Sequence, residues 1–196
     1  MSQPSYISAL NLPLKEKSAL DQDLQEAFSF LEQRLGFVPN VLKAYTFDEA
    51  KLRPFMDLYN VVMEAESPLT ELEREMIAVA VSSVNHCCYC LTAHGFAVRR
   101  LSEDPVLGEL MVMNYRSAGL EPRQRAMLDF AVKVAEQSSR VTEEDREMLR
   151  KHGFSDLAIW DICAVTGLFS MTNRMASALD MIPNEEYHYL ARDKKV

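Results

Sequence analysis

Hydrophobic residues recur along most of this chain at the three- and four-residue spacing of an α-helix, and no segment alternates convincingly as a β-strand would. The clearest example covers residues 70–85, where Met76, Val79 and Val84 share one face of the predicted helix. Comparable patterns predict further helices over residues 21–35, 41–45, 48–64, 87–100, 105–115, 121–137, 142–153 and 155–181. The sequence therefore predicts an all-α, multi-helix bundle.

Capping signals mark where several of these helices begin and end. Thr70 and Glu73 have the spacing of a capping box, in which each side chain accepts a hydrogen bond from the other residue's backbone amide. Thr142 caps a polar helix, with Asp145 three residues further on. Gly36 is a natural stop for the first long helix, because glycine readily adopts the left-handed conformation that ends helices.

Two of the predicted helices depart from a simple amphipathic pattern. The last one, residues 155–181, is apolar on nearly every side, which predicts a central position or a subunit interface. We interpret Asn173, which interrupts it, as a satisfied polar contact at an interface. In the helix expected at residues 48–64, Pro54 falls within the first turns, so the true start is predicted near Arg53.

The two ends of the chain lack a helical pattern. Residues 1–20 are predicted to form an extended arm along the body or along a neighbour. Residues 183–196 are polar and are predicted to form a loosely held tail. The length and the 48% hydrophobic content suit a single domain spanning residues 1–196.

An internal helical repeat is also suggested by the sequence. Residues 69–81 can be aligned with residues 120–132, with matching leucine, arginine, methionine, alanine and valine positions. In this alignment Ala126 stands where the first copy has Glu75. The second copy would thus have kept the packing and lost the chemistry, and convergent helix patterning is the alternative explanation.

Composition narrows the classes of function. The net charge is -8 without a basic cluster, so neither nucleic acid nor an anionic membrane is expected as a partner. The N-terminal residues lack the basic and apolar regions of a signal peptide, and no apolar run reaches membrane-spanning length. Clustered cysteines indicate working thiols in a reducing compartment, and we expect the cytoplasm.

The candidate chemistry lies between Glu75 and His94, in EMIAVAVSSVNHCCYCLTAH, which holds three of the four cysteines. Cys87, Cys90 and His94 fall within an arc of about 60° on the second helix of this stretch. Cys88 points about 100° away from Cys87 and does not belong to that set. Glu75 lies at the edge of the apolar face of the preceding helix.

These residue types suit thiol redox chemistry. A thiolate is the nucleophilic form of cysteine, and the helix N-terminus near Cys87 favours it. His94, one turn beyond Cys90, can take up a proton, and Glu75 suits a proton relay to that histidine. A second thiol three residues away can then close a disulfide. A structural zinc site on the same four residues is the alternative, although zinc ligands usually come as two pairs in loops.

The spacing Glu75-x11-Cys87-x2-Cys90-x3-His94 resembles the signature of alkylhydroperoxidase D (AhpD)-like proteins of the carboxymuconolactone decarboxylase superfamily, most closely its peroxidase-related branch. Stretches such as RLGFVPNVLKAY and GFSDLAIWDI extend the resemblance over most of the chain. It implies that Cys90 attacks the peroxide, that Cys87 is its disulfide partner, and that His94 and Glu75 relay protons. One position differs, because the best-studied members carry a histidine where Tyr89 stands.

The resemblance implies an AhpD-like helical fold and a thiol-dependent hydroperoxide reductase, an antioxidant oxidoreductase that needs no metal or other cofactor. Its partners would be a hydroperoxide and a dithiol or lipoylated protein that donates electrons. Assembly into a homotrimer or homohexamer is expected as well. A redox sensor or structural protein without turnover and a carboxymuconolactone-type decarboxylase are the alternatives. The Cys-x-x-Cys pair argues against the decarboxylase, because that reaction has no need of thiols.

Overall fold

The computed structural model describes residues 3–193, and within this range the chain forms nine α-helices and no β-strand. The helices are α1 (Gln22–Leu35), α2 (Asn40–Lys43), α3 (Glu49–Tyr59), α4 (Glu71–Val84), α5 (Cys88–Ser102), α6 (Pro105–Asn114), α7 (Pro122–Gln137), α8 (Glu143–Lys151) and α9 (Asp156–Ala178). Short 3₁₀ or π segments lie at Lys17–Ala19, Asn60–Glu64, Tyr115–Ser117, Ser138–Arg140 and Glu185–His188. The prediction of an all-α fold is confirmed.

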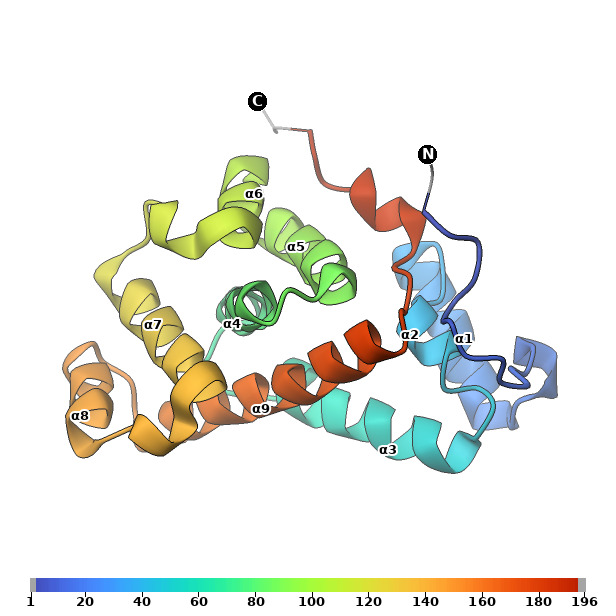
Figure 1. The fold of residues 1–196 in the computed structure, drawn as a ribbon, viewed down its shortest axis with the longest axis horizontal. Helices are drawn as coiled ribbons and strands as arrows, with labels where there is room; N and C mark the ends of the chain where they lie inside the picture. Colours follow the sequence, from blue (N-terminus) through green and yellow to red (C-terminus); the bar gives the residue numbers. More distant parts are fainter. Residues whose placement is uncertain (1–2, 194–196) are drawn as a thin grey trace.

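Helix α4 lies at the centre of the molecule, with α5, α6, α7 and α9 around it (Figure 1). Met76, Ile77, Val79 and Val81 are fully buried because α4 has neighbours on several sides. Burial of side chains of this size contributes about 1.5–3 kcal/mol each, so α4 is held firmly. Helix α9 packs against α4, as predicted for a central helix, but the side of α9 that carries Trp160 is exposed.

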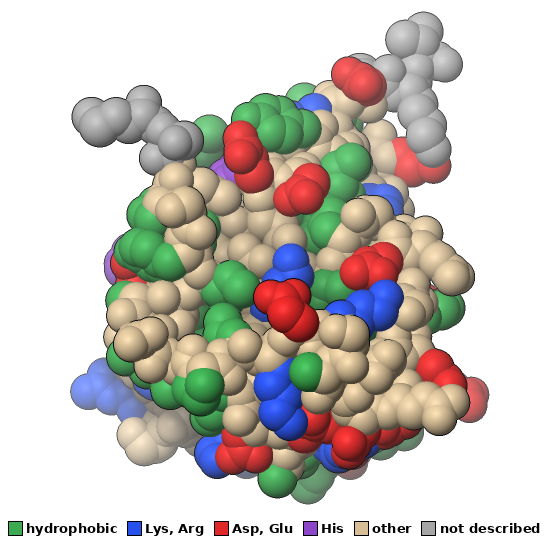
Figure 2. Space-filling view, turned by 90° about the vertical axis from the view of Figure 1, so that its right-hand side faces the viewer, with side chains coloured by type: hydrophobic (Ala, Val, Ile, Leu, Met, Phe, Trp, Pro, Cys, Tyr) green, Lys and Arg blue, Asp and Glu red, His purple; other side chains and the backbone are tan. Residues whose placement is uncertain are grey.

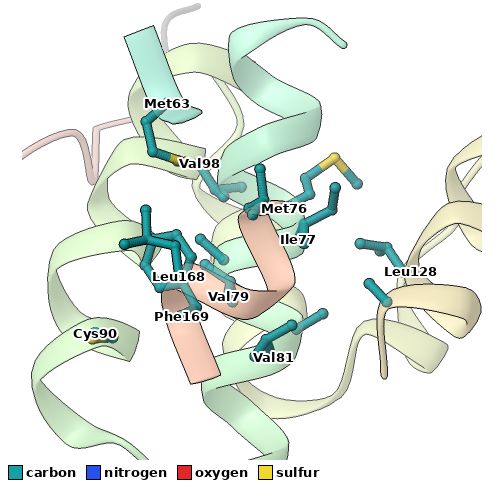
Figure 3. Packing of buried hydrophobic residues seen from close by; sticks show 14 of the residues in the cluster. Met63, Met76, Ile77, Val79, Val81, Cys90, Val98, Leu128, Leu168 and Phe169 are labelled. Carbon is teal, nitrogen blue, oxygen red and sulfur yellow. The ribbon is translucent and has the colours of Figure 1, made fainter. Parts of the chain in front are cut away.

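The core between α4 and α9 borders on the cysteines. Figure 3 shows side chains of both helices meeting there, with Leu168 and Phe169 of α9 near Val79 of α4 and with Cys90 at the margin. Phe169 is buried, and its ring meets the His94 ring edge-on at 4.6 Å between centroids. The packing of the core therefore reaches directly to the candidate site and limits how its side chains can move.

The predicted capping signals are present in the structure. The Glu73 amide donates to Thr70 Oγ1 at 3.1 Å, and the Thr70 amide donates to Glu73 Oε2 at 2.9 Å, so both are satisfied before α4 begins. Thr142 and Asp145 form the same reciprocal pair at the start of α8. Gly36 ends α1 with a left-handed φ of 88°.

The predicted start of α3 near Arg53 is wrong, because the helix begins at Glu49. The Asp48 side chain accepts a hydrogen bond from the Ala50 amide at 3.0 Å and caps the helix one turn earlier. Pro54 lies inside the helix, where the missing N–H leaves only the Ala50 carbonyl without its usual partner. A π-helical turn then continues α3 to Glu64.

The two stretches of the suggested repeat lie in α4 and α7, which pack against each other. Glu73 of α4 and Arg123 of α7 form an ion pair, and the Arg123 guanidinium lies 3.8 Å from the centre of the Phe154 ring. These contacts join the two helices at one end, and the repeat itself stays a prediction.

The N-terminal arm follows the end of α9. The Ala9 amide donates to the Leu179 carbonyl at 2.9 Å, and the Ile182 amide donates to the Ile7 carbonyl at 3.0 Å. The arm is thus fixed at two points by the backbone that follows α9, although residues 3–20 contain only one 3₁₀ turn, Lys17–Ala19.

The expectation of a loosely held C-terminal tail is wrong for residues 183–193, and the remainder, 194–196, lies outside the described residues. The Arg99 guanidinium is buried and donates to the Tyr187 carbonyl at 2.8 Å and to the Leu190 carbonyl at 3.2 Å. The Tyr187 ring packs edge-on against Phe37 at 4.9 Å. A polar composition did not reveal this anchoring, because its partners come from α5 and from the segment before α2.

Between residues 3 and 193 no single helix is both long and apolar enough to cross a membrane. One sharply bent pair of helices, α8 with α9, has the length and the composition of a membrane span, and only these two properties suggest it.

Candidate active site

The turn between α4 and α5 places the two candidate thiols at the start of a helix. Helix α4 ends at Val84, His86 takes a left-handed φ of 54°, and Cys87 is the N-cap of α5. His86 is exposed at this turn, as expected for a helix-end residue. Because α5 begins at once, the Cys90 side chain follows one helical turn after Cys87, on the same side.

The four cysteines are free thiols, and their exposure separates them as the helical geometry predicted. Cys87 and Cys90 are buried, with 1% and 4% of their surface exposed, whereas Cys88 is exposed. Cys163 is half-buried on α9 among apolar residues. The pair Cys87–Cys90 is therefore shielded from bulk solvent, whereas Cys88 belongs to the outer surface.

The two buried thiols share one hydrogen bond, which gives them opposite acidities. A hydrogen bond from the Cys90 thiol lowers the pKa of Cys87 to about 6, and the Cys90 amide, Ser177 and Asn173 support the thiolate further against the cost of burial. The same hydrogen bond, together with burial, raises the pKa of Cys90 well above its ordinary value. The shared hydrogen bond therefore favours the thiolate on Cys87 over a thiolate on Cys90.

The structure brings Glu75 and His94 together across α4 and α5. His94 Nδ1 lies 2.6 Å from Glu75 Oε2, and only 13% and 12% of the two side chains are exposed. This bond occupies Nδ1, so Nε2 is the ring nitrogen that remains to exchange a proton with a ligand. The proximity of these two residues, which the motif implied, is thus present in the fold.

A pocket of about 440 Å³ opens beside these residues, and its size is that of a small-molecule site. Cys90, His94 and Glu75 lie on its wall, and Cys87 is absent from the described residues that line it. Helices α1, α2, α3, α5 and α9 supply the apolar part of the lining, which includes Leu31, Leu35, Leu42, Phe55, Met56, Phe96 and Phe169. Cys90 is consequently the thiol that meets a pocket ligand, and Cys87 lies behind it.

Tyr89, which stands where better-known relatives have a histidine, makes a structural contact. Its side chain is buried, and its hydroxyl oxygen accepts a hydrogen bond from the Val41 amide at 2.8 Å. Burial raises the pKa of Tyr89 well above its ordinary value, so the phenol stays neutral. Tyr89 therefore ties α5 to α2, which forms one wall of the pocket.

Sequence reasoning missed several polar groups beside the thiols. Asn173 is buried inside the chain rather than at an interface, which corrects the predicted position. Its side-chain amide donates to Ser82 Oγ at 2.9 Å, and its oxygen accepts from Asn85 Nδ2 at 3.0 Å. The interrupted apolar pattern of the last helix indicated a satisfied polar contact, but it could not indicate that the contact lies beside Cys87 and Cys90.

The residues that the zinc alternative requires do not converge as a ligand set. Between residues 3 and 193, no group of three or more His, Cys, Asp or Glu side chains is placed to hold a metal ion. Instead, His94 Nδ1 lies within hydrogen-bond distance of Glu75, and the free thiols of Cys87 and Cys90 share a hydrogen bond. The geometry of the four residues favours proton and thiol chemistry.

Comparisons with known proteins agree with this geometry. The model of the carboxymuconolactone decarboxylase family matches residues 51–106, a range that includes the four candidate site residues. The crystal structure of a peroxidase-related protein from Silicibacter sp. TM1040 is 56% identical, with a TM-score of 0.93, over 98% of this chain and 100% of that one. An AhpD-core, peroxidase-related protein from Ralstonia eutropha JMP134 is 40% identical, with the same TM-score and the same coverage. Both are described as uncharacterized.

A more distant structure shares the fold alone. The debrominase Bmp8 is 19% identical, with a TM-score of 0.76 over 99% of this chain and 100% of that one. None of the curated proteins matches the chain. The conclusion about the family therefore rests on the two peroxidase-related structures. Their sequence identities of 56% and 40%, over 98% of this chain, are high enough to show a shared fold and family.

Proposed function

Because the chain belongs to the AhpD-like, carboxymuconolactone decarboxylase superfamily, we propose that it reduces organic hydroperoxides with the Cys87–Cys90 pair. The proposal rests on the position of Cys90, the thiol on the pocket wall, with a thiolate behind it and the His94–Glu75 pair beside it. An antioxidant role of this kind also agrees with the peroxidase-related names of the similar structures.

In the first step the Cys87 thiolate acts as the base for Cys90. The thiol proton of Cys90 passes along their hydrogen bond to Cys87, and the Cys90 sulfur attacks the terminal oxygen of the hydroperoxide. The O–O bond breaks, Cys90 becomes a sulfenic acid, and an alkoxide leaves. Two electrons move from the Cys90 sulfur to the peroxide oxygens in this step.

His94 then supplies the proton that the leaving alkoxide needs. Glu75 holds the imidazole through Nδ1, so Nε2 is the atom that donates a proton to the alkoxide and releases an alcohol. Cys87, now a thiol, attacks the Cys90 sulfenic acid, and its proton leaves with the hydroxide as water. The balance is two thiols plus ROOH giving one disulfide, ROH and water.

A dithiol, such as the lipoyl group of a partner protein, would return the pair to its reduced state. A donor thiolate can reach the Cys90 sulfur from the pocket, and Cys87 is the better leaving group because its thiolate is the more stable of the two. The second donor thiol then completes the exchange. The donor and its supply of electrons fit a reducing compartment such as the cytoplasm.

The test is a thiol count by mass spectrometry after seconds of exposure to one equivalent of cumene hydroperoxide. We expect a loss of two hydrogens, mapped to a Cys87–Cys90 link, followed by repeated turnover when a dithiol is added. Cys90→Ser should abolish turnover, and Cys88→Ser is the matched control that should retain it. A single oxidation without turnover would indicate a redox sensor, and full activity of Cys90→Ser would refute the mechanism.

We also propose that copies of the chain associate through the outer side of α9. Leu157, Trp160 and Met171 lie along one side of this helix with 60%, 73% and 40% of their surfaces exposed. Exposed apolar side chains in such a row are typical of interfaces between subunits. Sedimentation should show a trimer or hexamer, and Trp160→Glu should shift it towards the monomer; a wild-type monomer at micromolar concentration would contradict this.

A further inference from the structure

The pocket beside Cys90 is much larger than the oxidant that its chemistry strictly needs. Its volume is about 440 Å³, whereas a water molecule occupies about 30 Å³ of the liquid and hydrogen peroxide is only slightly larger. Phe30 of α1, which lines it, has 59% of its surface exposed although it is a large apolar side chain. A pocket of this size and lining fits an organic molecule with a long apolar part.

The pocket also contains a guanidinium that has no carboxylate partner among the residues that the structure describes. Arg34 and Arg100 both line it, and Arg34 is paired with Glu64 at 3.6 Å. Within residues 3–193 Arg100 has no carboxylate within ion-pair distance, and its guanidinium carbon lies 5.7 Å from the centre of the Phe96 ring. Glu75, the other acid of the wall, is already bound to His94. Arg100 is therefore available to an anionic group of a ligand.

The position of Arg100 on α5 sets a distance from the reacting sulfur. Cys90, His94, Ala97 and Arg100 all belong to the pocket lining and lie on one side of the helix. The ten residues from Cys90 to Arg100 correspond to a rise of about 15 Å along the helix axis. A ligand that meets both residues must therefore hold its hydroperoxide and its anionic group apart by a chain of several carbon atoms.

The surroundings of the pocket fit such a two-ended molecule. Figure 2 shows the side of the molecule that lies at the right of Figure 1, where α1, α2 and α3 are found, and there basic and acidic side chains stand among apolar ones. Leu31 and Leu35 of α1 and Met56 of α3 supply apolar lining opposite α5. Apolar walls with one exposed cation that no carboxylate of residues 3–193 pairs with are the arrangement that an amphipathic anion requires.

We infer that this pocket selects hydroperoxides of long-chain carboxylic acids, with the carboxylate bound by Arg100 and the hydroperoxide at Cys90. This inference rests on the proposed function for its chemistry, but the binding of the acid itself does not require turnover. Arg100 would be a specificity-determining residue, because a planar guanidinium can donate hydrogen bonds to both oxygens of a carboxylate. A neutral ester of the same chain would lose that contact and keep the apolar ones.

Binding is the first part of the test, because it is independent of peroxide chemistry. We would titrate the full chain with decanoate and with methyl decanoate by calorimetry, for the wild type and for Arg100→Gln. We expect the wild type to bind decanoate more tightly than methyl decanoate, and Arg100→Gln to lose this preference. The affinity of Arg100→Gln for decanoate should be roughly tenfold lower, which is the size of one charge-assisted hydrogen bond. Arg146→Gln, which removes an arginine on α8 that is outside the pocket lining, is the control and should bind as the wild type does.

Turnover is the second part and separates the two proposals. The hydroperoxide of linoleic acid should be reduced with a lower KM than its methyl ester, and Arg100→Gln should raise the KM of the acid only, with kcat unchanged. The activity of the wild type and of Arg100→Gln on cumene hydroperoxide, which has no carboxylate, should be the same. Binding of decanoate without any turnover would refute the peroxidase and leave the ligand class standing. Equal binding of acid and ester, or no binding because a second copy covers the pocket, would overturn the inference.

Discussion

His94 Nδ1 lies 2.6 Å from Glu75 Oε2, although the two residues are 19 positions apart and belong to different helices. The capping box fixes where α4 starts and thereby the direction of Glu75, and the turn at His86 fixes where α5 starts and thereby the direction of His94. A carboxylate that is hydrogen-bonded to one ring nitrogen fixes the orientation of the imidazole and leaves the other nitrogen to exchange a proton. In the proposed mechanism, the pair supplies a proton at a defined place on the pocket wall.

Replacing Glu75 by Gln should lower kcat/KM for an organic hydroperoxide by roughly a hundredfold or more, the usual range for loss of general acid catalysis. The amide keeps the shape of the side chain but lacks the negative charge that the carboxylate places beside His94. Steady-state kinetics with a dithiol donor measures this. Glu71→Gln, an exposed residue in the first turn of α4, is the control and should be unaffected. Equal rates for Glu75→Gln and the wild type would remove this pair from the mechanism.

The reduced protein should show one thiolate that forms with a midpoint near pH 6, because the Cys90 thiol and amide stabilise it on Cys87. Since this pKa is lowered in the fold, the thiolate is present above the midpoint and is lost as the pH falls through it. Ultraviolet absorbance of the thiolate during a pH titration measures it.

Cys90→Ala removes the hydrogen bond that contributes most to this shift, so the midpoint should rise towards the ordinary value for cysteine. Cys163→Ala is the control, because burial raises the pKa of that thiol and it should contribute nothing near pH 6. A midpoint that stays near 6 in Cys90→Ala would assign the stabilisation to the helix N-terminus and the polar neighbours instead.

The parts of the fold that local signals determine were predictable from the sequence. The capping pairs and the glycine stop act within one turn, so Thr70, Thr142 and Gly36 indicated the boundaries of α4, α8 and α1 closely. The common side of Cys87 and Cys90 and the separate direction of Cys88 follow from helical periodicity alone. These features need no knowledge of the tertiary structure.

The features that sequence reasoning missed depend on contacts between distant segments. Asn173 reaches Ser82 across 91 positions of the chain, and Arg99 reaches the Tyr187 carbonyl across 88. The pocket itself needs α1, α2, α3, α5 and α9 together. The lowered pKa of Cys87 likewise comes from a hydrogen bond in which the Cys90 thiol is the donor, and the spacing of the two cysteines does not show which of them donates. A linear pattern can name the reacting residues, but not the environment that gives each its role.

Tyr89→Phe should reduce stability while leaving the chemistry intact. The substitution removes the acceptor of the Val41 amide, and an unsatisfied, partly buried donor costs about 1 kcal/mol. Denaturant unfolding should show that loss, and kcat should stay within a few-fold of the wild type. Tyr189→Phe is the control, because that side chain is 70% exposed and its hydroxyl donates only to Glu185. A large fall in kcat at unchanged stability would instead place the Tyr89 hydroxyl in the reaction.

Arg99→Met should release the C-terminal segment and widen the pocket. Methionine can fill the space of the apolar stem, but it leaves the Tyr187 and Leu190 carbonyls without their donor, at a cost of about 1–3 kcal/mol. Because the Tyr187 side chain lines the pocket, the KM for an organic hydroperoxide should rise as well. Limited proteolysis should cut residues 185–193 faster than in the wild type, and denaturant unfolding should show the loss of stability.

Arg192→Met is the matched control for this change, because Arg192 also tethers the C-terminal segment but does so at the surface. It pairs with Glu109 at 2.7 Å, and with side chains 45% and 41% exposed such a pair contributes little, about 0–1 kcal/mol. Proteolysis and KM should therefore stay near the wild-type values in Arg192→Met. If both variants lost the segment equally, its anchoring would come from the surface pair and the packing of Tyr187 on Phe37, and the buried guanidinium of Arg99 would have no special part in forming the pocket.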